Sequence, residues 1–158
     1  MRAIVWIAES TWEACVDRAK ELLPADAEVT LLHVSPTDVE DVAGRGAGRL
    51  LGRRPPPPPG PPLRAIAAEE AQALLESARS RLGRAAQLDC RRGKVKREVV
   101  GACEDADLVV VARDGEARVG PKSLGPDTRF VVDHAPCQVL LVWASEPAAK
   151  PPKPPRRP

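Results

Sequence analysis

The segment ARDGEARVGPKSLGP, residues 112–126, combines residue types that can hold an anion. Gly115 and Gly125 have nine residues between them, as in a loop that wraps a phosphate chain, and Arg113 adds a cation. Glycine permits positive φ and lets the backbone approach an anion closely. The N-terminus of a following helix would offer backbone N–H groups as donors. The segment is therefore a candidate nucleotide-binding loop.

Two positions in this loop lack what an anion site needs. Ala112 adds a Cβ atom, which costs ~1 kcal/mol or more if φ is positive and almost nothing otherwise. Pro126 suits the first position of a helix but has neither an N–H group nor a hydroxyl. Losing one or two charge-assisted hydrogen bonds, each worth ~1.5–3 kcal/mol, weakens binding roughly ten- to a thousand-fold. Arg113, Arg118 and Lys122 either compensate or are solvated loop charges, and we expect weak nucleotide binding or none.

Apolar runs and segments of helical periodicity alternate along the chain. Most of the runs are rich in Val, Leu and Ile without polar alternation, which predicts strands covered on both faces. Strands are expected at 3–8, 28–34, 86–90, 107–111 and 138–143, and helices at 12–23, 67–82, 95–106 and 126–134. We predict an α/β fold: a single domain with a five-stranded, mostly parallel open sheet and helices on both faces. Ligands of such sheets bind beyond the carboxyl ends of strands, where residues 112–126 begin.

Two Pro-rich segments interrupt this pattern. We predict a domain over 1–146 with a flexible insertion rich in Gly, Arg and Pro at about 38–64, followed by a disordered basic tail at 147–158. Such composition buries too little apolar surface to offset the entropy of ordering. The sequence GRGAG at 44–48 suggests a dinucleotide fingerprint, but no strand precedes it. The Pro-rich segments are either solvated spacers or sites for a proline-recognising protein partner.

Charge and cysteine content exclude several classes of protein. The tail carries four Lys or Arg residues and the segment 44–64 carries five, while the whole chain has a net charge of +2. The remainder is therefore acidic, which argues against a specific nucleic-acid groove in the fold. We find no signal peptide and no membrane-spanning run, so we expect a cytoplasmic protein without membrane contact. The four cysteines form no C-x-x-C pair and predict neither disulfides nor a metal site: Cys15, Cys90, Cys103 and Cys137.

Four segments carry a resemblance to a known family. They are IAEST at 7–11, LLHV at 31–34, ADLVVV at 106–111 and HAPCQVLLV at 134–142. Taken in this order, they resemble the strands and loop approaches of the universal stress protein family. The resemblance covers nearly the whole chain outside the insertion and the tail. It implies a compact α/β sandwich that binds an adenine nucleotide.

The resemblance also assigns candidate binding residues. Family members that bind ATP carry Gly, two residues, Gly, nine residues, Gly, and then Ser or Thr. The three glycines of that pattern fall on Ala112, Gly115 and Gly125, and its hydroxyl falls on Pro126. Glu9 takes the place of the family's Asp near the nucleotide, where its longer side chain could still contact the ribose. Val34 would face the adenine through its backbone, or else packs in the core.

Two functions follow as hypotheses. The first is a stress-response accessory or regulatory protein that acts through dimerisation and partner contacts, with weak or absent nucleotide binding. The alternative is an ATP- or AMP-binding regulatory module in which residues 112–126 hold the phosphates with help from the loop cations. We expect no catalytic activity, because Ser123, Glu9 and Asp114 form no recognisable catalytic arrangement.

The last strand predicts self-association. Residues 138–143 are apolar and close the fold, so we expect them to form an edge of the sheet. An exposed edge tends to pair with a second copy of itself, and the resemblance also implies a dimer through this strand. The alternative is that the insertion covers this edge.

Overall fold

A computed structural model describes residues 1–37 and 61–145. The predicted tail and nearly all of the predicted insertion lie outside these residues. The strands are β1 (Arg2–Trp6), β2 (Glu28–Pro36), β3 (Gln87–Gly93), β4 (Leu108–Arg113) and β5 (Gln138–Trp143). The helices are α1 (Trp12–Leu22), α3 (Pro61–Leu82), α4 (Val95–Ala102) and α5 (Pro126–His134), with short 3₁₀ turns at Cys103–Asp105 and Pro121–Ser123. Strand and helix alternate as predicted.

The five strands form one parallel sheet in the order β3-β2-β1-β4-β5. The predicted fold class is therefore confirmed, and β5 lies at an edge of the sheet as expected. The order reverses beside β1, because β2 pairs with one side of β1 and β4 with the other. At such a reversal the helices that follow the strands cover opposite faces, which leaves a crevice at the carboxyl ends.

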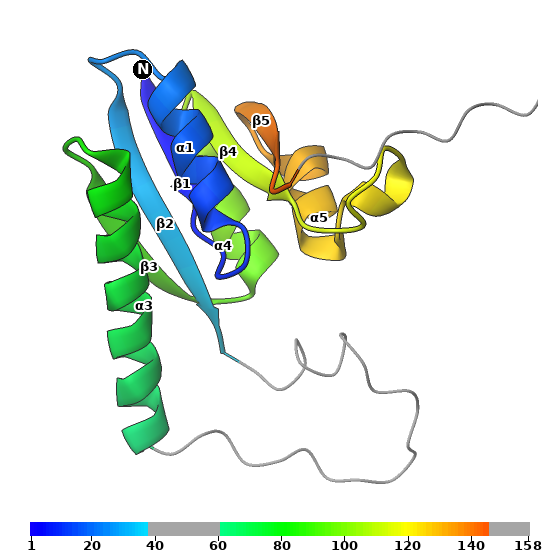
Figure 1. Ribbon diagram of the computed structural model, residues 1–158. Helices are drawn as coiled ribbons and strands as arrows, with labels where there is room; N and C mark the ends of the chain where they lie inside the picture. The colour runs from blue at the N-terminus through cyan, green and yellow to red at the C-terminus, as the bar shows by residue number, and fades with distance from the viewer. Residues whose placement is uncertain (38–60, 146–158) are drawn as a thin grey trace, which may run out of the picture.

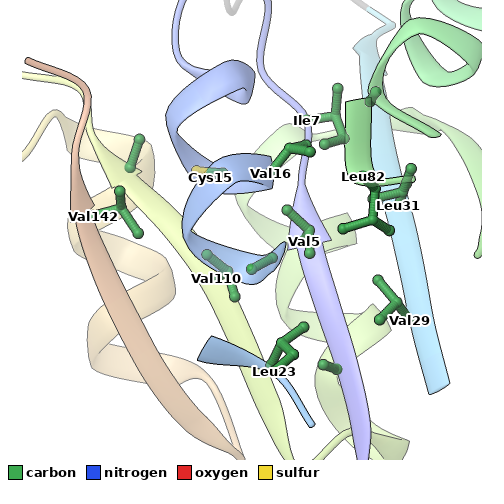
Figure 2. Packing of buried hydrophobic residues seen from close by; sticks show 14 of the residues in the cluster. Val5, Ile7, Cys15, Val16, Leu23, Val29, Leu31, Leu82, Val110 and Val142 are labelled. Carbon is green, nitrogen blue, oxygen red and sulfur yellow. The ribbon is translucent and has the colours of Figure 1, made fainter. Parts of the chain in front are cut away.

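Each face of the sheet packs against its own pair of helices. Alternate residues of one strand point to opposite faces, so Val5 belongs to one buried cluster while Ile4 and Trp6 belong to the other. The first cluster joins β1, β2, β4 and β5 to α1 and α3 through residues such as Val16 and Leu75. Figure 2 shows Val5, Val110 and Val142 on neighbouring strands beneath α1.

The second cluster lies on the opposite face. It joins the sheet to α4 and α5 through Val99 and Val131, both fully buried. Figure 1 shows α1 in front of the strands and α4 behind them. Burial on both faces explains why the strands read as continuous apolar runs in the sequence.

Three boundaries differ from those predicted by three residues or more, and the others agree within two residues. β3 continues through residues 91–93, which were expected to lead into a helix, and these residues pair with the end of β2. β3 is an edge strand, where half-exposed charges are tolerated, and Arg91 pairs with Asp89 at 2.9 Å. The predicted helix over 95–106 ends at Ala102 and continues only as a 3₁₀ turn.

The third difference is the start of α3. The helix begins at Pro61, within the last residues of the predicted insertion, rather than at residue 67. Proline at the start of a helix is favourable because its fixed φ is helical and the first N–H groups have no partner inside the helix. The start at residue 67 was predicted from the spacing of apolar residues. That spacing identifies only the part of α3 that packs against the sheet.

Candidate functional site

A cleft of about 910 Å³ opens at the carboxyl ends of the strands, beside the reversal of strand order. The residues after β1, the end of β2, the end of β4, the start of α5 and one side of α3 form its wall. Its volume suits a small-molecule ligand. The cleft therefore lies where the fold predicts a site, at the start of the segment 112–126.

The structure brings five of the seven predicted binding residues together. Glu9, Val34, Ala112, Gly125 and Pro126 all line the cleft. Arg113 and Gly115 do not line it. Val34 is buried in the second cluster, as the packing alternative predicted, and it also lines the cleft.

Ala112 is accommodated without backbone strain. It belongs to β4, pairs with Val142 of β5 and is 6% exposed. Within residues 1–37 and 61–145, no residue other than glycine has a positive φ. Replacing the glycine of the pattern by alanine therefore costs almost nothing in backbone strain, as the favourable case of the prediction required.

The two predicted glycines are needed for close packing. Neither Gly115 nor Gly125 has a positive φ. A Cβ atom on Gly115 would lie 2.1 Å from the carbonyl oxygen of Lys122, because the loop folds back on itself there. The Gly115 N–H donates to the carbonyl of Ser123 at 3.0 Å and fixes this close approach. Gly115 thus shapes the loop from outside the cleft.

Gly125 is in close contact with a carboxylate of the same chain. A Cβ atom on Gly125 would lie 2.7 Å from Asp114 Oδ2, and its own N–H donates to Asp114 Oδ1 at 2.7 Å. α5 begins directly after, at Pro126, as predicted. Asp114 therefore occupies the helix N-terminus, where the positive end of the helix dipole would otherwise attract a phosphate.

Sequence reasoning did not assign Asp114 to the site. The available signal was its position directly after β4, since residues at the carboxyl ends of parallel strands face the crevice. Thr128 was also missed. It is 1% exposed and lines the cleft, and it places a hydroxyl two residues after the position that Pro126 leaves without one.

The lining of the cleft is acidic. Four carboxylate residues contribute to it and, among the described residues that line it, there is neither Lys nor Arg. The carboxylate residues are Glu9, Glu70, Asp114 and Asp127. A phosphate group would enter a negative potential, which opposes its binding.

The three loop cations are engaged outside the cleft. The Arg113 guanidinium lies 4.7 Å from the centre of the Trp143 ring and donates to Ser123 Oγ at 2.5 Å. Arg118 and Lys122 both pair with Glu116, at 3.4 Å and 3.6 Å. Arg113 is thus held in the structure by these contacts, whereas the pairs of Arg118 and Lys122 with Glu116 are exposed and contribute little to stability.

The fold and this site can be compared with known proteins. The model of the universal stress protein family matches residues 8–142 of the chain. The chain belongs to the universal stress protein family. Among curated proteins, none matches this chain.

Solved structures share the fold of this chain at low sequence identity, and two of the three described next are universal stress proteins. A universal stress protein in complex with cAMP is 19% identical with a TM-score of 0.61, covering 92% of this chain and 98% of that one. A universal stress protein family protein from Arabidopsis thaliana with AMP bound is 16% identical with a TM-score of 0.58, covering 99% and 98%. The hypothetical protein MJ0577 is 20% identical with a TM-score of 0.65, covering 90% and 94%. At these identities the likeness concerns the fold alone.

Ser123, which was considered for catalysis, and the two histidines of this universal stress protein all have structural contacts. Ser123 is fully buried and its hydroxyl donates to the Gly120 carbonyl at 2.7 Å. His134 stacks on Phe130 with ring centres 4.0 Å apart at the end of α5. His33 is buried, and its Nδ1–H donates to the Ile7 carbonyl at 2.9 Å, joining the ends of β1 and β2.

Two further features concern metals and membranes. Among the described residues, no three His, Cys, Asp or Glu side chains are grouped as metal ligands would be. No helix within the same residues has the length and apolar character needed to cross a membrane.

Proposed function

We propose that this universal stress protein is a stress-response accessory or regulatory protein that acts through self-association and partner contacts, with weak or absent nucleotide binding. The observation that carries the proposal is the Asp114 carboxylate at the N-terminus of α5, bonded to the Gly125 N–H. A terminal phosphate could accept a hydrogen bond from this N–H group only after displacing the Asp114 carboxylate.

Electrostatics supports the same conclusion. Two like charges 4 Å apart repel by ~4 kcal/mol at an effective dielectric constant near 20 and by ~1 kcal/mol in bulk water. A nucleoside triphosphate placed in the cleft would bring several negative charges toward Glu9, Asp114 and Asp127. The loop cations Arg113 and Lys122 would have to leave Trp143 and Glu116 to offset this repulsion.

The alternative function is an ATP- or AMP-binding regulatory module. It is supported by the volume and position of the cleft and by the cAMP and AMP present in two solved structures of similar fold. In that case residues 112–126 would hold the phosphates, and the apolar part of the cleft near Val34 and Leu74 would receive the base. The two functions differ in how strongly the phosphate groups contribute to affinity.

Self-association is part of the first proposal. β5 is an edge strand, and Val139, Leu140, Leu141 and Trp143 all remain partly exposed on it. Half-buried apolar side chains on a free edge favour pairing with a second copy, and closed two-fold dimers are the commonest result. We further propose that the Pro-rich segments serve protein partners and that the chain is not an enzyme.

Calorimetry with adenosine, AMP and ATP tests the proposal directly, together with the nucleotide content of the purified protein. Millimolar dissociation constants, with ATP binding no better than adenosine, would support an accessory protein. Micromolar affinity that increases from adenosine to ATP would establish the nucleotide-binding module instead. An assay for release of phosphate from ATP under the same conditions tests the absence of catalysis.

A further inference from the structure

Two cysteines that are far apart in the sequence lie together on the side of the sheet opposite α1. Cys103 begins the 3₁₀ turn after α4 and is fully buried, whereas Cys137 immediately precedes β5 and is half-buried. Pairing of the last two strands brings them together: β4 and β5 start side by side at Leu108 and Gln138, and the Gln138 N–H donates to the Asp107 carbonyl at 3.2 Å. Cys103 belongs to the second apolar cluster, and Cys137 packs against that cluster.

Cys137 packs against the cluster that contains Cys103, and each thiol influences the pKa of the other. Each also contacts the backbone: Cys103 Sγ donates to the Val99 carbonyl at 3.1 Å, and Cys137 Sγ lies 3.5 Å from the Gln138 carbonyl oxygen. The other two cysteines of the sequence are placed differently. Cys15 is a buried residue of α1 on the opposite face, and Cys90 is exposed on β3.

From this placement we propose that Cys103 and Cys137 form a reversible intrachain disulfide when the protein meets a peroxide. Cys137 reacts first, because its side chain is partly accessible while Cys103 is fully buried. Cys103 then resolves the oxidised intermediate, because it lies in the same apolar cluster against which Cys137 packs. The disulfide would join the end of α4 to the start of β5.

The proposed chemistry is balanced by one molecule of peroxide. The Cys137 thiolate attacks one oxygen of hydrogen peroxide, the O–O bond breaks, and the leaving hydroxide takes up the proton of the thiol to become water. The product is a sulfenic acid on Cys137. The Cys103 sulfur then attacks Cys137 Sγ, forming the S–S bond and breaking the S–O bond, and the Cys103 proton leaves with the hydroxyl as a second water. Two thiols lose two electrons, and the peroxide gains them.

The environment of the two thiols makes their oxidation by peroxide slow. Burial raises the pKa of the Cys103 thiol to about 12 and also raises the pKa of the Cys137 thiol. Arg91 favours the Cys103 thiolate, whereas Asp107 disfavours the Cys137 thiolate. Because the thiolate is the reactive species, the pair stays reduced under mild conditions and is oxidised only by sustained exposure to peroxide.

Peptide mapping without reductant tests the proposal on the full chain. The protein is treated with hydrogen peroxide, remaining thiols are blocked by alkylation in denaturant, and the digest is analysed by mass spectrometry. We expect a linked peptide pair containing Cys103 and Cys137, two hydrogen atoms lighter than the reduced peptides, which disappears after dithiothreitol. Cys90→Ser should leave this product unchanged, whereas Cys137→Ser should abolish it.

The controls separate the proposal from incidental oxidation. Cys103→Ala keeps the buried site apolar, and circular dichroism checks that it folds; it should leave Cys137 as a sulfenic acid that dimedone traps. Among the disulfide-linked peptides, the share that joins Cys103 to Cys137 should be larger in the native protein than in urea, where all four cysteines are exposed. A bond between two chains, a sulfenic acid on Cys137 beside an unreacted Cys103 in the wild type, or the same share of this link in urea would each overturn the proposal.

Discussion

The Asp114 carboxylate accepts a hydrogen bond from the Gly125 backbone N–H at 2.7 Å and thereby occupies the N-terminus of α5. Gly125 permits this approach, because any Cβ atom at that position would collide with the carboxylate. A negative group at this end of a helix is stabilised by the helix dipole. The contact therefore stabilises the start of α5 while occupying an N–H group that a phosphate at this helix N-terminus would use.

Replacing Asp114 should raise the affinity for ATP and lower the stability of the fold. Asp114→Ala frees the Gly125 N–H and removes one negative charge from the cleft, so ATP affinity should rise roughly tenfold, equivalent to ~1.4 kcal/mol. The free energy of unfolding should fall by about 0.5–1 kcal/mol, because a helix N-terminus loses its carboxylate. Calorimetry and urea unfolding measure the two effects. Asp26→Ala, at the amino end of β2, is the charge-matched control and should leave ATP affinity unchanged.

Pro126 should limit phosphate binding more than Ala112 does. Pro126→Ser restores a backbone N–H and a hydroxyl at the start of α5, and one charge-assisted hydrogen bond is worth ~1.5–3 kcal/mol. Ala112→Gly removes a methyl group from a buried strand position that carries no strain, so it should lower stability by ~1 kcal/mol without raising affinity. Titration of both single variants and the double variant with ATP compares them. Equal affinity in Pro126→Ser and the wild type would show that donors were not the limiting factor.

Arg113 should contribute to stability and not to ligand binding. Arg113→Ala loses the contact with Trp143 and the hydrogen bond to Ser123, which together are worth about 1–2 kcal/mol. Thermal unfolding should show a lower melting temperature with no loss of nucleotide affinity. Lys122→Ala, whose side chain is 75% exposed, is the control and should leave the melting temperature unchanged. A selective loss of ATP binding in Arg113→Ala would instead place this cation on the phosphates.

The ion pair between Asp17 of α1 and Arg81 of α3 should be lost in acid. Arg81 donates to both carboxylate oxygens of Asp17, at 2.7 Å and 2.8 Å, and this hydrogen bonding lowers the pKa of Asp17 below its usual 3.8. A carboxyl group whose pKa is lower in the folded state stabilises the fold above its unfolded pKa. That contribution is lost as the pH falls through the folded pKa. Urea unfolding between pH 6 and pH 3 should show a smaller decrease for Asp17→Asn than for the wild type, and added salt should reduce the difference because the pair is exposed.

The edge strand β5 should support self-association. Light scattering of the wild type at tens of micromolar should give the mass of a dimer, and Val139→Lys should shift it toward a monomer, because a charge on an edge strand opposes pairing. Leu88→Lys makes the same change on β3, the other edge of the sheet, and should preserve the dimer. A monomeric wild type, or equal effects of both variants, would count against pairing through β5.

Local chemistry of the sequence predicted the elements that hold the site. Val, Leu and Ile runs gave the positions of β1, β2, β4 and β5, and the favourable position of proline in a first turn correctly placed the start of α5 at Pro126. Alternation of strands and helices predicted the parallel sheet and the side of it that bears the cleft. β3 was less well predicted, because an edge strand needs only one covered face and admits charges such as Arg91.

Tertiary structure alone decided how the charged side chains are used. Nothing in the spacing of residues 112–126 shows that Asp114 turns back onto Gly125, or that Arg113 turns away toward Trp143. Those orientations depend on β5 lying beside β4 and on the loop folding against its own backbone at Gly115. The sequence by itself thus determined an α/β sheet with a site at its carboxyl edge. The three-dimensional packing determined that the lining of this site is acidic and that Asp114 occupies the N-terminus of α5. The physical reason is that the direction of a side chain depends on contacts with residues that are distant in sequence.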